Sequence, residues 1–163
     1  MAVIGLDPGS AITGYGILDE SADHSLKVIA YGVLRTEAGE PLAARLQSLY
    51  IQLNELLILH RPESGAVENL FFQRNVRTAL AVGQARGVLL LALAQAGIPA
   101  TEYNPMEVKQ AVAGYGKADK PQMQQMVKML LGLKEIPRPD DAADALAIAI
   151  CHIHSRRFNS MKE

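Results

Sequence analysis

The sequence predicts an α/β fold: a mixed five-stranded sheet with three antiparallel strands, further parallel strands and helices on both faces. Three strand-like runs open the chain at Ala2–Asp7, Tyr15–Asp19 and Lys27–Arg35, separated by glycine-bearing or polar turns. Such short connections favour an antiparallel meander. Helical and strand-like segments then alternate, which is typical of right-handed βαβ crossovers and parallel pairing.

The remaining elements follow in order along the chain. Leucines spaced three and four residues apart after Pro41 predict an amphipathic helix that ends near His60. A short strand comes next, and glycine or proline residues lie at the ends of the later helices. The predicted segments are a strand at Gly65–Glu68, a helix at Val76–Ala96 closed by Gly97, a strand at Ile98–Tyr103, and helices at Pro105–Ala113, Pro121–Leu131 and Asp141–His154.

Composition predicts one domain. The 163 residues are 49% hydrophobic and 20% charged, which is enough for a real core. We expect a single domain over residues 1–157 and a flexible polar tail over 158–163. No uninterrupted apolar run reaches the roughly 18 to 20 residues that span a bilayer, so we expect a soluble protein. Cys151 lies in an apolar helical pattern, which predicts a core thiol in a reducing cytoplasm.

Net charge does not point to a nucleic-acid partner. The chain carries 16 basic and 17 acidic residues, for a formal charge of -1 at pH 7. Binding to a polyanion would therefore require locally segregated charge.

Two acids end predicted strands. Asp7 ends the first strand and Glu68 the fourth, and chemistry in such sheets gathers beyond the carboxyl ends of parallel strands. Taken singly, Asp7 is a turn acid and Glu68 a solvated strand end. Pro8 and the glycines that follow, Gly9, Gly14 and Gly16, are expected to turn the chain away and leave Asp7 in a shared crevice.

A third group of acids lies in "DDAADALAIAICH". Asp141 and Asp144 are three residues apart, so they share one face of an otherwise apolar helix. Asp140 or Asp141 has the alternative role of a helix cap. Capping does not explain Asp144, one turn inside the helix, where an unpaired charge would cost several kcal/mol.

The four acids predict a metal site. Two carboxylates about 4 Å apart repel by roughly 4 kcal/mol at an effective dielectric of 20, so Asp7, Glu68, Asp141 and Asp144 need a counter-charge. Oxygen ligands suit Mg²⁺ or Mn²⁺. Two such ions would support phosphodiester hydrolysis. His152 and His154 are two apart on a helix, so we expect packed or surface histidines.

Aromatic and basic residues follow the strand that ends at Glu68. "FFQRNVR" combines Phe71 and Phe72 with Arg74 and Arg77. An aromatic ring there would stack on an unpaired base while the arginines bind phosphates. The alternative is that the phenylalanines pack in the core, and we expect this of one of them.

Lysines gather around "GYGKADK". Lys117 and Lys120 flank a predicted helix start, and Lys109 lies one helix earlier. Glycines and a helix amino end favour phosphate binding. Solvated lysines are the alternative, and the spacing is not that of a Walker loop.

Five segments together resemble one family: "GLDPGSAITGYG", "VENLFF", "VGQARGVLL", "VKQAVAGYGKADK" and "DDAADALAIAICH". In this order, over nearly the whole chain, they are similar to the RuvC-type Holliday-junction resolvases, which have a ribonuclease H-like fold. The resemblance implies a Mg²⁺- or Mn²⁺-dependent endonuclease of recombination and repair, a homodimer that nicks two opposing strands of a four-way DNA junction symmetrically. It also implies a cytoplasmic location and a branch-migration motor of the RuvA and RuvB type as partner.

The resemblance assigns roles by motif position. The catalytic, metal-binding acids would be Asp7, Glu68, Asp141 and Asp144, with Asp140 an additional acid. Phe71 falls at the family's base-stacking position, and Lys109 and Lys120 at its active-site or backbone contacts. Part of the helix with Ala79, Gly83 and Gly87 would form the dimer contact, whereas its alternative is packing on its own sheet.

Two other functions compete with this one. An ATP-dependent phosphotransferase of the actin and hexokinase type also places an acid before glycines after its first strand, but it needs two such domains. A junction-binding scaffold without catalysis would not need all four acids.

Overall fold

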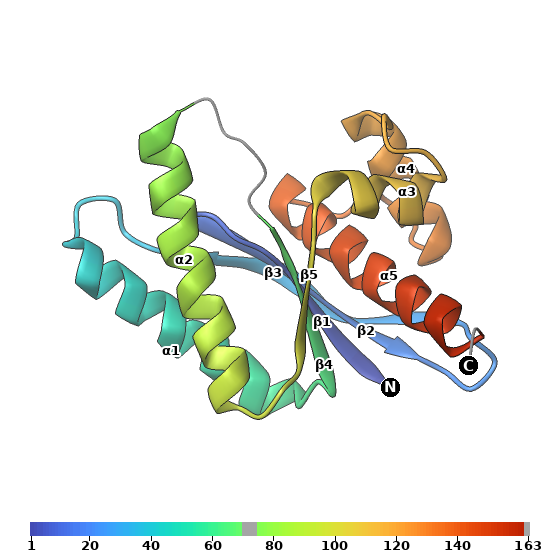
Figure 1. Cartoon of the computed structure of the whole chain (residues 1–163), viewed down its shortest axis with the longest axis horizontal. Helices are drawn as coiled ribbons and strands as arrows, with labels where there is room; N and C mark the ends of the chain where they lie inside the picture. Colours follow the sequence, from blue (N-terminus) through green and yellow to red (C-terminus); the bar gives the residue numbers. More distant parts are fainter. Residues whose placement is uncertain (70–74, 162–163) are drawn as a thin grey trace.

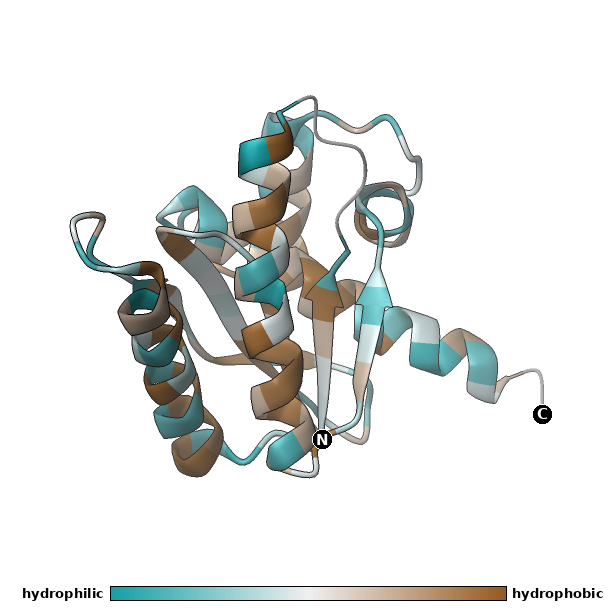
Figure 2. Cartoon of the chain, turned by 60° about the vertical axis from the view of Figure 1, so that its left-hand side comes forward, coloured by the Kyte–Doolittle hydropathy of each residue, from teal (hydrophilic) through white to brown (hydrophobic). Residues whose placement is uncertain are grey.

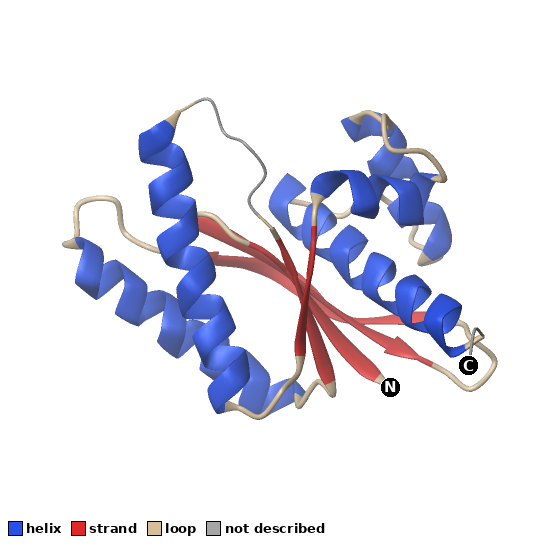
Figure 3. Ribbon diagram, in the orientation of Figure 1, coloured by secondary structure: helices blue, strands red, loops and turns tan. Residues whose placement is uncertain are grey.

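The computed structural model describes residues 1–69 and 75–161. A five-stranded sheet with the order β3-β2-β1-β4-β5 forms its centre (Figure 3). Strands β1, β2 and β3 pair antiparallel, whereas β4 pairs parallel with β1 and β5 parallel with β4. The predicted mixed sheet is confirmed. Its strands are β1 (Ala2–Asp7), β2 (Ile12–Glu20), β3 (Leu26–Arg35), β4 (Ser64–Glu68) and β5 (Ala100–Tyr103).

Helices cover both faces of the sheet (Figure 1). Helices α1 (Leu42–His60) and α2 (Val76–Gln95) lie on one face, where buried leucines of both helices pack against Ile4 and Leu6 of β1. Helix α5 (Asp140–Ser160) lies on the other face, with α3 (Pro105–Ala113) and α4 (Lys120–Leu130) beside it. Each face therefore has its own apolar core.

Glycines in β1 and β2 let α5 lie directly on the sheet. A Cβ atom added to Gly14 would come 2.0 Å from the carbonyl oxygen of Asp141, and one added to Gly5 would come 2.2 Å from that of Ala145. At Gly16 the nearest atoms belong to Leu146. The expectation that Gly14 and Gly16 turn the chain is wrong, because both lie inside β2 and provide room for α5.

Helix α5 is longer than the sequence predicts. It continues to Ser160, beyond the expected end at His154, so residues 158–160 belong to the helix and not to a separate tail. Arg157 contributes to this extension, because its guanidinium donates to Glu20 Oε1 at 2.6 Å and to the carbonyl of His24 at 2.7 Å. The β2–β3 hairpin thus holds the last turns of α5.

Helix α2 has an unusually apolar surface. Within the described part of the chain it is the one helix that could cross a membrane by length and composition, with a mean hydropathy of 1.4 over a window that is 22% buried. Apolar residues recur over most of its length (Figure 2). Such a helix is weak support for insertion, and Arg86 within it pairs with Glu102 of β5.

Candidate active site

Asp7 and Glu68 lie side by side at the carboxyl ends of two parallel strands. Leu6 of β1 pairs with Val67 of β4, so the next residue on each strand is one of the two acids. Their carboxyl groups are within hydrogen-bonding reach of each other. Burial, followed by the charges of Glu68, Asp144 and Asp141, raises the pKa of Asp7 to about 9. Burial also raises the pKa of Glu68. The pair therefore holds a proton near neutral pH.

Asp141 and Asp144 approach this pair from the other face of the sheet. Gly14 is the register partner of Asp7 and also the residue on which the Asp141 backbone rests, which explains why the acids of α5 act on Asp7. The capping alternative is wrong for Asp140 and Asp141, because the N-cap residue is Pro139 and no side chain caps the helix. Both acids lie in its first turn instead. The crevice thus gathers acids from β1, β4 and α5.

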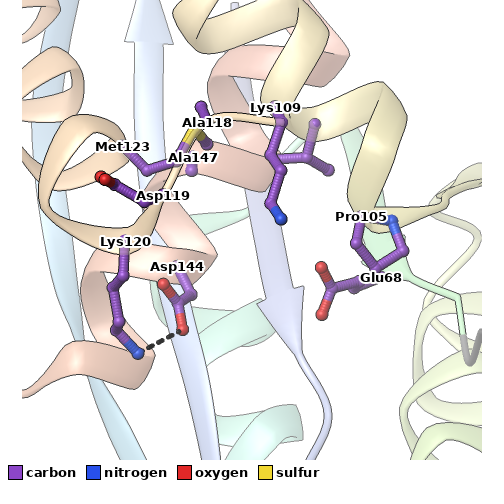
Figure 4. Close-up of a pocket in the computed structure, with 10 residues that line it drawn as sticks. Glu68, Pro105, Lys109, Ala118, Asp119, Lys120, Met123, Asp144 and Ala147 are labelled. Carbon is purple, nitrogen blue, oxygen red and sulfur yellow. Dashed lines mark ion pairs between the residues drawn. The ribbon is translucent and has the colours of Figure 1, made fainter. Parts of the chain in front are cut away.

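Two lysines face the acids. Lys120, the first residue of α4, places Nζ 3.4 Å from Asp140 Oδ2 and 3.6 Å from Asp144 Oδ2. Burial raises the pKa of Asp144, and Lys120 counteracts it. Lys109 of α3 directs its ammonium group towards the space between Asp144 and Glu68, where its charge opposes the rise in the pKa of Glu68 (Figure 4). The predicted approach of Lys109 and Lys120 to the acids is present in the structure.

Comparisons with known proteins agree over nearly the whole chain. Residues 3–152 match the family described as "Crossover junction endodeoxyribonuclease RuvC". The chain belongs to the RuvC family of crossover junction endodeoxyribonucleases. The protein of that name from Pelotomaculum thermopropionicum is 58% identical over 94% of this chain and 93% of its own, and the one from Chloroflexus aurantiacus 60% over 95% and 94%.

A solved RuvC structure has the same fold. T. thermophilus RuvC in complex with Holliday junction substrate superposes with a TM-score of 0.93, at 41% identity over 98% of this chain and 97% of that one. The ribonuclease H-like fold expected from the resemblance is thereby confirmed. As a RuvC family member the chain is an endonuclease of the Holliday junction resolvase class.

RuvC nucleases depend on metal ions, and the donor chemistry of the crevice fits hard cations. Its candidate ligands are carboxylate oxygens, and burial together with the neighbouring negative charges raises the pKa values of Asp7 and Asp144. Across the described residues, no three His, Cys, Asp or Glu side chains lie close enough together to hold one metal ion between them.

The other predicted contact residues are less close to the acids or are not described. Phe71, Phe72 and Arg74 lie outside the described residues. Arg77 is exposed at the start of α2, where its backbone N–H donates to Asn75 Oδ1, and Lys117 is exposed in the loop before α4. The structure thus joins Lys109 and Lys120 to the acids but gives Arg77 and Lys117 no comparable place.

Sequence reasoning missed several residues around the acids. Gln124 donates to Asp140 Oδ1 at 3.2 Å, and an apolar wall that includes Met123 adjoins the crevice. A capping box between Asp119 and Gln122 begins α4 at Lys120, one residue before the predicted start. The sequence shows this box as an aspartate followed three residues later by a glutamine, and that pattern predicts a helix start at Lys120.

The histidines and the cysteine are structural. His152 is buried, with Nδ1 2.9 Å from the Tyr103 hydroxyl and Nε2 3.0 Å from Ser64 Oγ. His154 Nδ1 lies 3.1 Å from the carbonyl of Ala111. Cys151 is a buried free thiol whose pKa burial raises to about 11. The predictions of packed histidines and a core thiol are confirmed.

Proposed function

We propose that Asp7, Glu68, Asp141 and Asp144 are the catalytic acids of this junction endonuclease and that they hold Mg²⁺ or Mn²⁺, two ions in each site. The convergence of acids from β1, β4 and α5 on one crevice carries the proposal. So much negative charge in one place is costly without cations. The enzyme would cut two opposing strands of a four-way junction symmetrically, in recombination and repair.

The chain's own groups would position the scissile phosphate. Asp7 and Glu68, at the ends of rigid paired strands, fix one side of the site, and Asp144 on α5 fixes the other. The bound ions would activate water and stabilise the leaving 3′ oxygen. Lys120, whose ammonium group lies beside Asp140 and Asp144 at the edge of the site, would bind a phosphate oxygen of the DNA. Lys109 would bind a second one.

The remaining DNA contacts are inferred from the family resemblance. Phe71 would stack on an unpaired base near the cut, with Phe72 and Arg74 next to it in the chain. Arg77 and Lys117 are both exposed, and neither side chain forms an ion pair or a hydrogen bond within the described part of the chain, so both could contact a phosphate. We also infer a cytoplasmic enzyme that works with a branch-migration motor of the RuvA and RuvB type.

A homodimer would use the apolar surface of α2. Val76, Leu80 and Leu91 are 79%, 63% and 52% exposed, and their spacing places them on one side of the helix. Gly87 is exposed on the same side, and a Cβ atom there would meet nothing within 4 Å. The alternative that Gly87 allows α2 to pack closely on its own sheet is therefore not supported. A second copy of the chain would cover this surface and bring two sites to one junction.

Cleavage of a synthetic mobile four-way junction tests the proposal. Wild-type protein with Mg²⁺ or Mn²⁺ should cut the junction in preference to duplex, flap and RNA:DNA hybrid. Asp7→Asn should bind the junction normally and cut it at least a hundredfold more slowly, because a metal ligand is weakened. Asp23→Asn is the matched control, since Asp23 is an exposed acid of the β2–β3 turn. Wild-type cutting by Asp7→Asn would refute the metal-site assignment.

A further inference from the structure

A pocket of about 250 Å³ lies beside the acids, between α3, the start of α4, and α5 (Figure 4). Val108, Ala118 and Ala147 are almost fully buried and form its floor. Met123 of α4 is half-buried and forms a side wall. The pocket and the active site share an opening, because Glu68, Lys109, Lys120 and Asp144 border the same space. A ligand group in the pocket would therefore lie next to the phosphodiester that the acids cut.

The lining selects one part of a DNA strand. A phosphate placed against the side chains of Val108, Ala118 and Ala147 would lose its water without gaining hydrogen bonds, which is costly. A nucleobase has two apolar faces and polar edges, so it matches apolar walls with charged groups at the mouth. The thioether of Met123 would add a favourable sulfur contact with an aromatic ring. The two lysines at the mouth suit the phosphates on either side of that base.

The size of the pocket agrees with this choice. Ligand sites in proteins commonly measure roughly 300 to 1,000 Å³, so a space of about 250 Å³ is small and suits one planar ring system. The polar side chain of Asp119 does not compete for the base, because it accepts from the backbone N–H of Gln122 as the cap of α4. The floor is buried: Val108 and Ala147 belong to the packed helices α3 and α5, and Ala118 lies in the loop just before α4.

We propose that this pocket receives one unstacked base of the strand being cut, next to the scissile phosphate. The proposal rests on the junction endonuclease activity described above and deepens it. Removing a base from its stack costs least where pairing is already interrupted, as at the crossing point of a junction. Base entry would then align the strand over the acids.

Abasic substitution tests the proposal in the wild-type protein. Junctions with a single abasic nucleotide, moved stepwise through the positions around the cut, should all be bound. One position should be cut about tenfold more slowly, the effect expected from losing one base contact. Met123→Phe, which fills the pocket, should slow the intact junction to a similar extent. In that variant the abasic position should have no further effect, because the base contact is already lost.

A second measurement does not depend on cutting. A 2-aminopurine placed at the sensitive position should brighten when wild-type protein binds the junction without divalent metal, and should brighten less with Met123→Phe. Met129→Ala is the matched control, since Met129 is 70% exposed on the same helix. It should behave as wild type, and thermal melting should show both variants folded.

The outcomes separate the two proposals. If wild-type protein cuts junctions but no abasic position slows it, or if the slowing is the same in Met123→Phe, the pocket does not hold a base. If wild-type protein does not cut junctions with either metal, the proposed function fails. The pocket then stands or falls with the 2-aminopurine signal and its dependence on Met123.

Discussion

Asp7 has a carboxyl group that keeps its proton far above the usual range. Its pKa is about 9, raised first by burial and then by Glu68, Asp144 and Asp141. The folded protein therefore binds a proton at Asp7 that the unfolded chain releases near pH 3.8, its ordinary pKa. Because the unfolded state binds fewer protons across this window, stability without metal falls as pH rises from about 4 to about 9.

Asp7→Asn should remove this loss. In EDTA at pH 8 we expect the variant to be more stable than wild type by roughly 1 to 3 kcal/mol, the cost of an unsatisfied buried polar or charged group. The difference should shrink at pH 5, because the stability that wild type loses by keeping this proton grows only as the pH rises above 3.8, the ordinary pKa of Asp7. Thermal melts at both pH values check this. Equal melting temperatures at pH 8 would show that burial and the neighbouring acids do not raise the pKa of Asp7.

Lys120 pairs with Asp140 and Asp144 at the edge of the proposed site, and these ion pairs are half-exposed, so its main contribution should be to cleavage. Lys120→Met should reduce junction cutting more than tenfold. It should change the free energy of unfolding by less than about 1 kcal/mol, because half-exposed ion pairs are weak. Lys134→Met, in the exposed loop after α4, is the control. Single-turnover cutting and urea denaturation measure the two effects, and unchanged cutting would remove Lys120 from the site.

Helix α5 carries two of the acids, and its position depends on the absence of a side chain at Gly14. A Cβ atom 2.0 Å from the Asp141 carbonyl oxygen cannot be accommodated without moving the helix. Gly14→Ala should therefore destabilise the fold by roughly 1 to 3 kcal/mol. It should also slow cutting and raise the metal concentration needed for half-maximal rate.

Gly39→Ala is the matched control for Gly14→Ala. Gly39 lies in the loop before α1, and a Cβ atom there would meet nothing within 4 Å. It should leave melting temperature and metal dependence unchanged. If Gly14→Ala behaved like Gly39→Ala, the close approach of α5 to β2 would not be what places Asp141.

The elements differ in how far the sequence predicts them. The bounds of β1 and α3 are as predicted, since an apolar run stops at Asp7 and a proline and a glycine border the helix. The position of Glu68 beside Asp7 could also be predicted, because chemistry in such sheets gathers beyond the carboxyl ends of parallel strands. The role of Gly14 could not be predicted, because a glycine in a strand looks like one in a turn until the helix that packs on it is known. The pocket beside Met123 could not be predicted either, because its lining comes from α3, α4 and α5 and depends on how these helices pack together.

At the scale of the whole molecule, one copy of the chain has one crevice of acids, whereas a symmetric pair of cuts needs two. The exposed apolar side of α2, which includes Val76, Leu80, Gly87 and Leu91, is the surface we assign to the second copy. It lies on the opposite face of the sheet from α5 (Figure 1). A contact there would leave the α3, α4 and α5 side of each copy free for DNA.

Leu80→Glu should therefore convert a dimer to a monomer, because it puts a charge at the centre of an apolar contact. Light scattering after size exclusion should show the wild type at twice the monomer mass and the variant at the monomer mass. Ile58→Glu is the control, since Ile58 is 72% exposed on α1 and outside the assigned surface. On a junction labelled in two opposing strands, the monomer should make single nicks, whereas the control should still cut both strands. A Leu80→Glu protein that stayed dimeric would place the contact elsewhere.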